Sequence, residues 1–425
     1  MSLTREKYQA YCDILKEELR LAMGCTEPIA IAYSASVARG YMEQEPTSIT
    51  INLSGNIIKN TKSVVVPATG GMHGIPAAVI AGTVANKPEL VLEVLSALSS
   101  EDIPKMQAMM ENCPVEVKEL DTTHIFEIVL VMENDKEEVQ VRLLDRHTNL
   151  VYVEKNGQVL LRNEQEEEDG GIKTDRTLLN VEDIVTFADE VEIEDVRELL
   201  ERQIECNMAI AERGMQGDFG IGIGRAILET YADSTYTKMR AYAAAASEAR
   251  MDGCDMPVII TSGSGNQGIT STVPVIVFAR ENGIPEERMH RALVFSALLT
   301  IYQKEYIGKL SAFCGAVSAA CAAGAAITYI KGGTLTQIKD TVDNTLADVP
   351  GIICDGAKAS CAVKISSALD AALFAHSLAM KGKVYASNTG ILQDDTGETI
   401  SCVGHIGRVG MQPTDQEIVK IMIQG

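Results

Sequence analysis

The sequence predicts an α+β protein with a mostly helical body and a smaller β-rich part. Apolar residues recur at helical spacing over much of the chain, whereas residues 113–163 alternate apolar and polar side chains as strands do. A hydrophobic fraction of 46% in 425 residues is enough to build a sizeable core. We therefore expect three parts, residues 1–111, 112–171 and 172–425.

The first part is expected to combine helices with short strands. Residues 4–22 and 26–41 have helical spacing, and the second stretch begins with a hydroxyl residue followed two positions later by proline, as helices often do. Residues 47–53 alternate like a strand, and residues 64–66 are expected to form a short buried strand.

Period-2 alternation predicts that the second part consists of short strands. The turn sequences Asn134-Asp135 and Asn156-Gly157 separate some of these strands. The acidic run 164–171 that follows is expected to be a solvated linker.

The third part is expected to be helical, with alanine-rich segments at 241–249, 311–330 and 368–380. The segment 311–330 has no charged residue, so a membrane span must be considered. Its Ala, Gly, Ser and Cys content makes it only weakly hydrophobic. We therefore expect a helix buried among other helices.

Charge and composition exclude several classes of partner. The chain has 37 basic and 59 acidic residues, a formal net charge of −22, and no Trp. An acidic protein is not attracted to a nucleic-acid backbone or an anionic membrane, and scarce aromatic residues offer no platform for stacking bases. We expect neither nucleic acid nor a membrane as partner.

The ten cysteines are too widely dispersed for a small disulfide scaffold. The N-terminal residues are charged and lack the apolar run of a secretory signal. We therefore expect a reducing cytoplasm, where cysteines pack in cores, bind metals or take part in catalysis.

Cys314, Cys354 and Cys361 are candidate metal ligands. Cys354 and Cys361 are seven positions apart, so they share one face if the segment is helical throughout. Alternatively, Asp355-Gly356 caps a helix and leaves Cys354 on the preceding loop. Three soft sulfur ligands suit an iron–sulfur cluster or zinc, and simple packing of buried thiols is the alternative.

Cys25 lies just before a predicted helix N-terminus, where the helix dipole is expected to lower a thiol pKa. A thiolate there could act in catalysis or bind a metal. His73 and His405 lie in glycine-rich loops and are candidate acids or bases, with a structural role as the alternative.

Three polar loops, 54–56, 262–268 and 388–390, are candidate anion sites, because backbone N–H groups beside a helix start bind carboxylate or phosphate. Flexible turns are the alternative. The stretch 220–224 superficially resembles a dinucleotide loop, but its spacing is wrong and its surroundings are helical. We therefore exclude a Rossmann site.

Taken together, these segments resemble the L-cysteine desulfidase family, which is related to the alpha chain of iron–sulfur L-serine dehydratases. The resemblance extends from about residue 20 to residue 390. It rests on Gly24-Cys-Thr-Glu-Pro, Ser54-Gly-Asn-Ile-Ile-Lys, Ser262-Gly-Ser-Gly-Asn-Gln-Gly, Cys314-Gly and Cys354-Asp-Gly-Ala-Lys-Ala-Ser-Cys-Ala-Val-Lys.

The resemblance implies a cytoplasmic lyase with an oxygen-sensitive [4Fe-4S] cluster and no pyridoxal phosphate. The implied cluster ligands are Cys314, Cys354 and Cys361, with one iron left open or closed by a displaceable group. The implied reaction converts L-cysteine and water to pyruvate, ammonia and hydrogen sulfide. Cys25 would be the base or a temporary fourth ligand, and Cys402 remains a possible ligand.

An open iron is a Lewis acid, and a substrate thiolate is a soft ligand for it. A base must remove the α-proton, which a Cys25 thiolate could do. The groups expected to hold the carboxylate or amino group of the amino-acid substrate are Asn56, Ser262, Ser264, Asn266 and Gln267.

Other functions stay open at this point. The substrate could be serine or another β-substituted amino acid. A pyridoxal-phosphate lyase would use the 262–268 loop for phosphate and Lys358 or Lys364 as the Schiff base, and a cysteine or metal sensor would bind without turnover. Packing through small residues is also compatible with a homodimer, although the sequence sets no stoichiometry.

Overall fold

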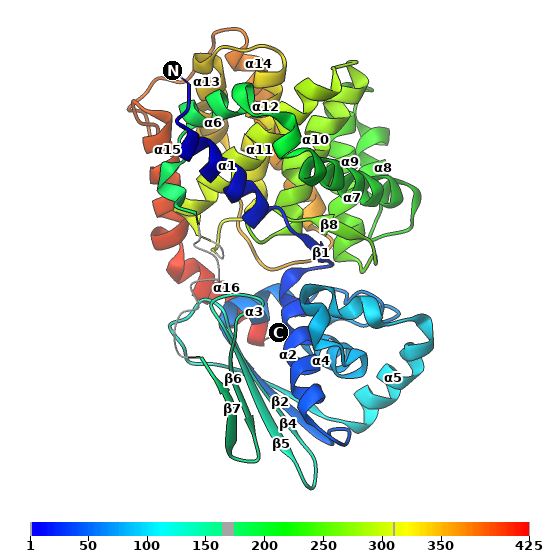
Figure 1. Ribbon diagram of the computed structural model, residues 1–425. Helices are drawn as coiled ribbons and strands as arrows, with labels where there is room; N and C mark the ends of the chain where they lie inside the picture. The colour runs from blue at the N-terminus through cyan, green and yellow to red at the C-terminus, as the bar shows by residue number, and fades with distance from the viewer. Residues whose placement is uncertain (1, 164–173, 309–310, 425) are drawn as a thin grey trace.

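A six-stranded sheet with its covering helices forms one lobe of the molecule, and a bundle of helices forms the other (Figure 1). The computed structural model describes residues 2–163, 174–308 and 311–424. The expected α+β class with a mostly helical body is confirmed. The expected acidic linker at 164–171 lies outside the described residues.

The sheet has the strand order β3-β2-β4-β5-β6-β7. β2 and β3 are parallel and the other neighbouring pairs are antiparallel. The strands are β2 (Ser48–Leu53), β3 (Val115–Glu119), β4 (Glu127–Glu133), β5 (Glu138–Leu144), β6 (Leu150–Lys155) and β7 (Gln158–Arg162). Alternate residues of β2, β4 and β5 are buried, which explains the period-2 pattern.

Helices cover the buried face of this sheet. α2 packs against β4 and β5, and α4 packs against α2. The helical elements of this lobe are α2 (Thr26–Tyr41), α3 (Gly55–Thr61), α4 (Gly74–Ala85), η1 (Pro88–Ala97), η2 (Ser100–Asp102) and α5 (Ile103–Asn112).

Two expected elements of the N-terminal part are corrected. The strand expected at residues 64–66 is wrong, because Val65 forms only an isolated bridge with His73 in a turn-rich loop. The helix expected over 4–22 ends at Glu18, and Leu21–Met23 instead pairs with a strand distant in sequence.

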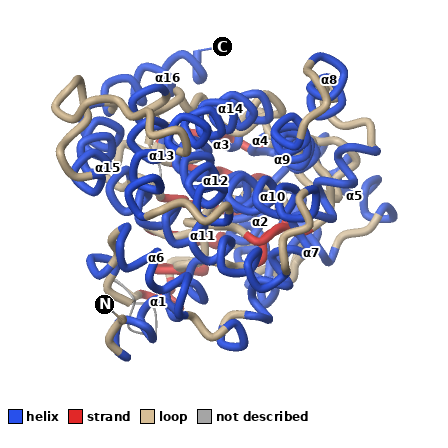
Figure 2. The backbone as a smooth tube through the Cα atoms, turned by 90° about the horizontal axis from the view of Figure 1, so that it is seen from above, coloured by secondary structure: helices blue, strands red, loops and turns tan. Residues whose placement is uncertain are grey.

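In the helical lobe, α10, α11 and α12 lie in the middle, and the other helices surround them (Figure 2). α12 packs against α10, α11, α13 and α14. The helices of this lobe are α1 (Arg5–Glu18), η3 (Arg176–Leu178), α6 (Val181–Glu190), η4 (Ile193–Asp195), α7 (Arg197–Gln216), α8 (Ile223–Thr230), α9 (Thr235–Met251), α10 (Gly265–Glu281), α11 (Glu286–Ile307), α12 (Ala316–Ile330), α13 (Leu335–Asp348), α14 (Cys361–Ala379), α15 (Thr396–His405) and η5 (Ile406–Gly410).

The uncharged segment 311–330 becomes a buried helix only from Ala316 onward. Its alanine and glycine residues allow close contact with the neighbouring helices. Within the described part of the chain, no helix has both the length and the apolar character needed to cross a membrane.

Two segments connect the lobes. β1 (Leu21–Met23) pairs with β8 (Pro257–Ile259) just before the chain enters α2. α16 (Gln412–Gln424) leaves the helical lobe and packs against α3, where the buried Lys59 forms an ion pair with Asp415. Each lobe is therefore completed by residues distant in sequence.

The packing groups the chain differently from the expected three parts. β2 and α2 share one hydrophobic core with β4 and β5, so the expected boundary at residue 111 falls inside the sheet lobe. Tyr11 and Leu15 of α1 belong instead to the core of the helical lobe.

Gly82 provides a test of the contact between α2 and α4. A Cβ atom at Gly82 would lie 1.9 Å from the carbonyl oxygen of Ala32, whereas a Cβ at Gly40 of α2 would have no neighbour closer than 3.7 Å. We expect Gly82→Ala to lower the free energy of unfolding by about 3 kcal/mol through overpacking. Gly40→Ala should leave it unchanged or raise it by up to ~1 kcal/mol. Chemical denaturation measures both, and equal effects would contradict this packing.

Candidate active site

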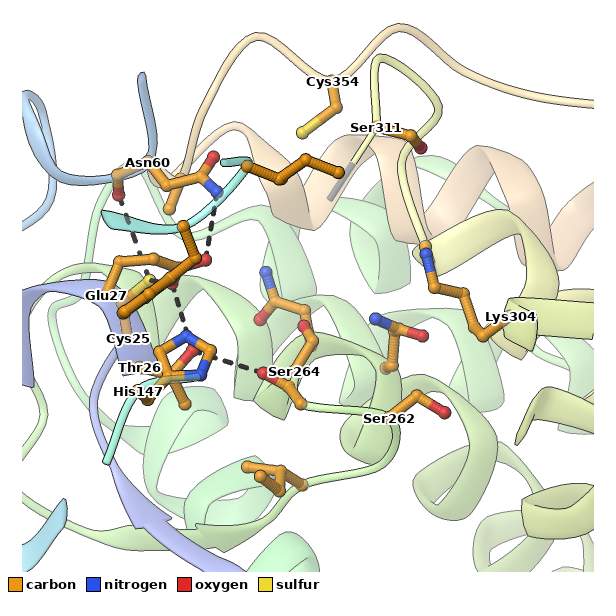
Figure 3. Close-up of a pocket in the computed structure, with 18 of the residues that line it drawn as sticks. Cys25, Thr26, Glu27, Asn60, His147, Ser262, Ser264, Lys304, Ser311 and Cys354 are labelled. Atoms are coloured by element: carbon orange, nitrogen blue, oxygen red, sulfur yellow. Dashed lines mark hydrogen bonds between the residues drawn. The ribbon is translucent and has the colours of Figure 1, made fainter. Parts of the chain in front are cut away.

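A cavity of about 610 Å³ lies where loops of the sheet lobe meet the helical lobe. Its walls come from the N-terminus of α2, the end of α3, the loops before β4 and after β5, and the ends of α9, α10, α11, α12 and α14 that face this junction. Figure 3 shows residues of both lobes pointing into it. The cavity contains most of the polar motifs found in the sequence.

Cys314, Cys354 and Cys361 all line this cavity. The backbone N–H of Cys314 donates to the carbonyl of Ile352 (2.8 Å), and that of Cys354 donates to the carbonyl of Ala312 (2.7 Å). These bonds flank an antiparallel bridge between Phe313 and Ile353. Cys354 therefore lies on a loop, as in the second of the two arrangements considered from the sequence, and Cys361 is the first residue of α14. The cap expected at Asp355-Gly356 is wrong, because Ser360 is the N-cap residue of this helix.

The three thiols have different electrostatic environments. A hydrogen bond from Cys314 lowers the pKa of Cys354, and the charges of Lys59 and Lys364 act in the same direction although burial opposes them. The same hydrogen bond, together with burial, raises the pKa of Cys314. Burial also raises the pKa of Cys361. Cys354 is therefore the thiol of this group that ionises most readily.

These thiols fit an iron–sulfur cluster by the chemistry of their donor atoms. All three are soft ligands, they face one cavity, and lysine charges stabilise a thiolate among them. In the residues that the structure describes, no three His, Cys, Asp or Glu side chains already stand at metal-binding distances.

The loop between Cys354 and Cys361 is pressed against the sheet lobe. Gly356 has a φ of +92°, and a Cβ there would lie 2.1 Å from the carbonyl oxygen of Lys59. Lys358 and Lys364 both form ion pairs with Asp355. Neither lysine is among the residues that line the cavity, so the geometry does not favour them as Schiff-base residues.

Cys25 is the N-cap residue of α2 and is buried at the cavity wall. The expected lowering of its pKa is wrong. Burial raises the pKa of the Cys25 thiol well above its ordinary value, and the adjacent Glu27 carboxylate adds to this effect. The nearby Arg250 acts in the opposite direction, but its contribution is smaller than the loss of hydration.

Glu27 is the centre of a buried hydrogen-bond network. Its Oε2 accepts hydrogen bonds from the Cys25 thiol (3.1 Å) and the Thr26 hydroxyl (3.0 Å), and its Oε1 accepts one from Asn60 Nδ2 (3.0 Å). Burial alone would raise the pKa of Glu27, but the nearby His147 and these hydrogen bonds keep it below its ordinary value. The network therefore pairs a protonated thiol with a carboxylate.

The loop 262–264 leads from β8 into α10. Ser262 has a left-handed φ of +48°, and the side chain of the N-cap residue Ser264 makes no capping hydrogen bond. Ser262, Ser264, Asn266 and Gln267 line the cavity as a group. Asn266 Oδ1 accepts a hydrogen bond from the buried Arg250 (3.1 Å), which orients both side chains.

Asn56 does not line this cavity. It lines an adjoining cavity of about 820 Å³, which shares Ser311 and residues 123–125 with the first. The Asn56 Oδ1 is buried there without a hydrogen-bond partner. Its expected contact with substrate remains a prediction.

Several other candidates lie away from the cavity. His73 is the N-cap residue of α4, His405 ends α15, and Cys402 lies within α15. None of the three is a lining residue. The glycine-rich stretch 220–224 wraps around Glu248, whose carboxylate accepts hydrogen bonds from two backbone N–H groups of that stretch.

Sequence reasoning missed five residues that the fold brings to the cavity: Glu27, Asn60, His147, Arg250 and Lys304. Glu27 belonged to a recognised motif, and Asn60 directly follows another. Arg250, Lys304 and His147 have no local sequence signal. They reach the cavity only through the packing of α9, of α11 and of the loop after β5, respectively. Burial lowers the pKa of Lys304 to about 8 although Cys314 and Cys354 oppose this shift.

Comparison with known proteins relates the chain to one family. Residues 89–420 match the model of the family described as serine dehydratase alpha chain. A UPF0597 protein of Desulfitobacterium hafniense is 46% identical over 98% of this chain and 97% of its own length. UPF0597 proteins of Lachnoclostridium phytofermentans and Treponema denticola are 46% and 45% identical and are covered over their whole length.

The electrostatics of the cavity predict that Cys354 and Cys25 differ in reactivity. Alkylation proceeds through the thiolate, so a thiol with a lowered pKa reacts at neutral pH and one with a raised pKa does not. In protein prepared without metal, we expect iodoacetamide to modify Cys354 faster than Cys25 at pH 7. Only the Cys25 rate should keep rising as the pH is increased above 9. Peptide mapping by mass spectrometry measures both rates, and a Cys25 rate that levels off below pH 8 would contradict the assignment.

Proposed function

Because the chain belongs to the serine dehydratase alpha chain family, we propose that this cavity is the active site of a lyase that converts L-cysteine to pyruvate, ammonia and hydrogen sulfide. The family match confirms the relation to serine dehydratase alpha chains expected from the motifs, and it indicates a lyase-type enzyme. The observation that carries the proposal is the convergence of Cys25, Glu27 and three further cysteines on one cavity.

Cys314, Cys354 and Cys361 are the proposed ligands of a [4Fe-4S] cluster. Serine dehydratase alpha chains are generally associated with iron–sulfur clusters. The proposal is supported by the bridge between Phe313 and Ile353, which holds two of the thiols in contact. When bound, the cluster supplies an iron without a protein ligand, which is a Lewis acid suited to a sulfur leaving group.

Cys25 is the proposed base. Its thiol is hydrogen-bonded to a carboxylate, so its proton can pass from Sγ to Glu27 Oε2. The resulting thiolate takes the α-proton of the substrate, while the Cβ–S bond breaks and sulfide leaves. Thr26 and Asn60 hold the Glu27 carboxylate in place during this transfer.

The cavity-lining residues of α10 and its preceding loop are the proposed contacts of the amino-acid portion of the substrate. These residues are Ser262, Ser264, Asn266 and Gln267. The aminoacrylate formed by elimination leaves the site and hydrolyses in water to pyruvate and ammonia. The overall reaction consumes one water molecule and involves no net oxidation or reduction.

L-serine is the second candidate substrate, because the matched family is described by serine dehydration. The same proton transfer from Cα would apply, with hydroxide or water leaving in place of sulfide. Assays of pyruvate formation with L-cysteine and L-serine in parallel separate the two substrates. A cysteine or metal sensor would bind ligand and release neither sulfide nor pyruvate.

The proposed division between base and ligands predicts opposite effects of two substitutions. Cys25→Ala should lower kcat for sulfide release by about 10²–10⁴-fold, because the base is lost, while the iron content stays near that of the wild type. Cys361→Ala should lower the iron content itself. Iron, acid-labile sulfide and initial rates are measured on protein purified without oxygen.

Cys402→Ala is the matched control, since Cys402 lies on α15 outside the cavity. This substitution should change neither kcat for sulfide release nor the iron content. Full turnover by the Cys25→Ala variant would remove Cys25 from the mechanism.

A further inference from the structure

Lys304 is a buried lysine whose side chain makes no hydrogen bond or ion pair within the described residues. It lies near the end of α11, its exposed fraction is 5%, and it lines the cavity. Its Nζ has no hydrogen-bond acceptor and no carboxylate partner among the residues that the structure describes. Burying a charge without a partner is strongly unfavourable, so the position indicates an anionic ligand that enters the cavity.

The other lysine and arginine side chains of the cavity wall are already engaged. Lys59 pairs with Asp415, Arg176 pairs with Glu17 and Glu18, and Arg250 donates to Asn266. Arg20 donates to a backbone carbonyl, and Arg146 also has a partner. Among the described lysines and arginines of the cavity wall, Lys304 is therefore the one whose charged group makes no hydrogen bond or ion pair, whereas Arg250 is held by Asn266 and only its Nε lacks a partner.

The N-terminus of α10 adds a second positive element to the same cavity. α10 has 17 residues, and its N-cap side chain makes no capping hydrogen bond. The first N–H groups of a helix have no partners within it and carry partial positive charge. Gln267, only 4% exposed, lies in this first turn and has an Oε1 without a partner, which can accept a hydrogen bond from an ammonium group.

Figure 3 separates two ends of the cavity. Ser262 and Lys304 lie on one side of the view, and Cys25, Thr26, Glu27 and Asn60 lie on the other. The end that carries Lys304 thus offers positive charge without a carboxylate, whereas the opposite end offers a carboxylate and a thiol with the guanidinium of Arg250 close to both.

We propose that Lys304 is the counter-ion of the substrate's α-carboxylate, which it holds together with the N-terminal N–H groups of α10. This inference rests on the proposed function and specifies its selectivity: the site takes free α-amino acids and rejects those whose carboxylate is blocked. Lys304 would then fix the substrate at its non-reacting end, opposite the Cys25 thiol.

Two thiol probes test how much the carboxylate charge contributes to binding. 3-Mercaptopropionate and 3-mercaptopropionamide differ only in the charge of the carboxyl end, and neither has an amino group to release. Their binding to anaerobically purified holoenzyme is measured by calorimetry. We expect the wild type to bind the carboxylate at least about 30-fold more tightly than the amide, since loss of one partner from a buried charge pair has an effect of this size.

Lys304→Met should remove this preference by weakening the binding of the carboxylate alone. Lys304→Arg should retain part of the preference, and Lys331→Met, which alters an exposed lysine at the end of α12, should retain all of it. In the Lys304→Met variant, KM for L-cysteine should rise more than kcat falls. The iron content should remain that of the wild type.

Equal binding of both probes to the wild type would overturn the inference without any variant, as would the absence of binding by either probe. An unchanged preference in Lys304→Met would also overturn it. If the Lys304→Met variant lost its iron, the role of Lys304 would instead be to stabilise the binding of the cluster by the cysteines. If the preference depends on Lys304 but L-cysteine gives no product, the carboxylate site stands and the proposed function fails.

Discussion

The bridge between Phe313 and Ile353 is the contact on which the rest of the site depends. It joins the loop before α12 to the loop before α14, and it brings two cysteines that are 40 positions apart in sequence (354 − 314) into hydrogen-bonding contact. The close approach of Gly356 to the backbone of Lys59 then presses this pair of loops against the sheet lobe. The cavity is therefore shaped by backbone contacts, which leave the cysteine side chains available for chemistry.

Burial is the largest influence on the protonation of the Cys25 thiol. Cys25 occupies the N-cap position that ordinarily favours a thiolate, yet loss of hydration and the Glu27 carboxylate keep its proton in place. Such a thiol is a weak nucleophile at rest. In the proposed mechanism, it acts as a base after its proton has moved to the carboxylate with which it shares a hydrogen bond.

Much of the fold could be predicted from the sequence, because its local patterns are strong. The helical start at Thr26, the alternating strands and the helix within 311–330 all follow from spacing and composition. The strand expected at 64–66 was wrong, because a short buried apolar run does not specify a ladder. The boundary at residue 111 fell within one core because the pairing of β2 with β4 is a long-range contact, invisible to local patterns.

The residues of the candidate site could be predicted where they belong to a recognisable sequence motif. The four polar residues of the 262–267 segment and the three cysteines all line the cavity, whereas Asn56 lies in the adjoining one. Arg250 and Lys304 could not be identified, because each is an ordinary helical residue in sequence. Their burial and their charge environment arise only when α9 and α11 pack beside the cysteine loops.

The activity proposed for this cavity is the elimination of sulfide from L-cysteine. The most direct test is to incubate anaerobically purified, iron-containing protein with L-cysteine and to quantify hydrogen sulfide and pyruvate over time. We expect both products to accumulate in equal amounts and at a rate proportional to the protein concentration. Protein that retains its full iron content but releases neither product from L-cysteine would contradict it.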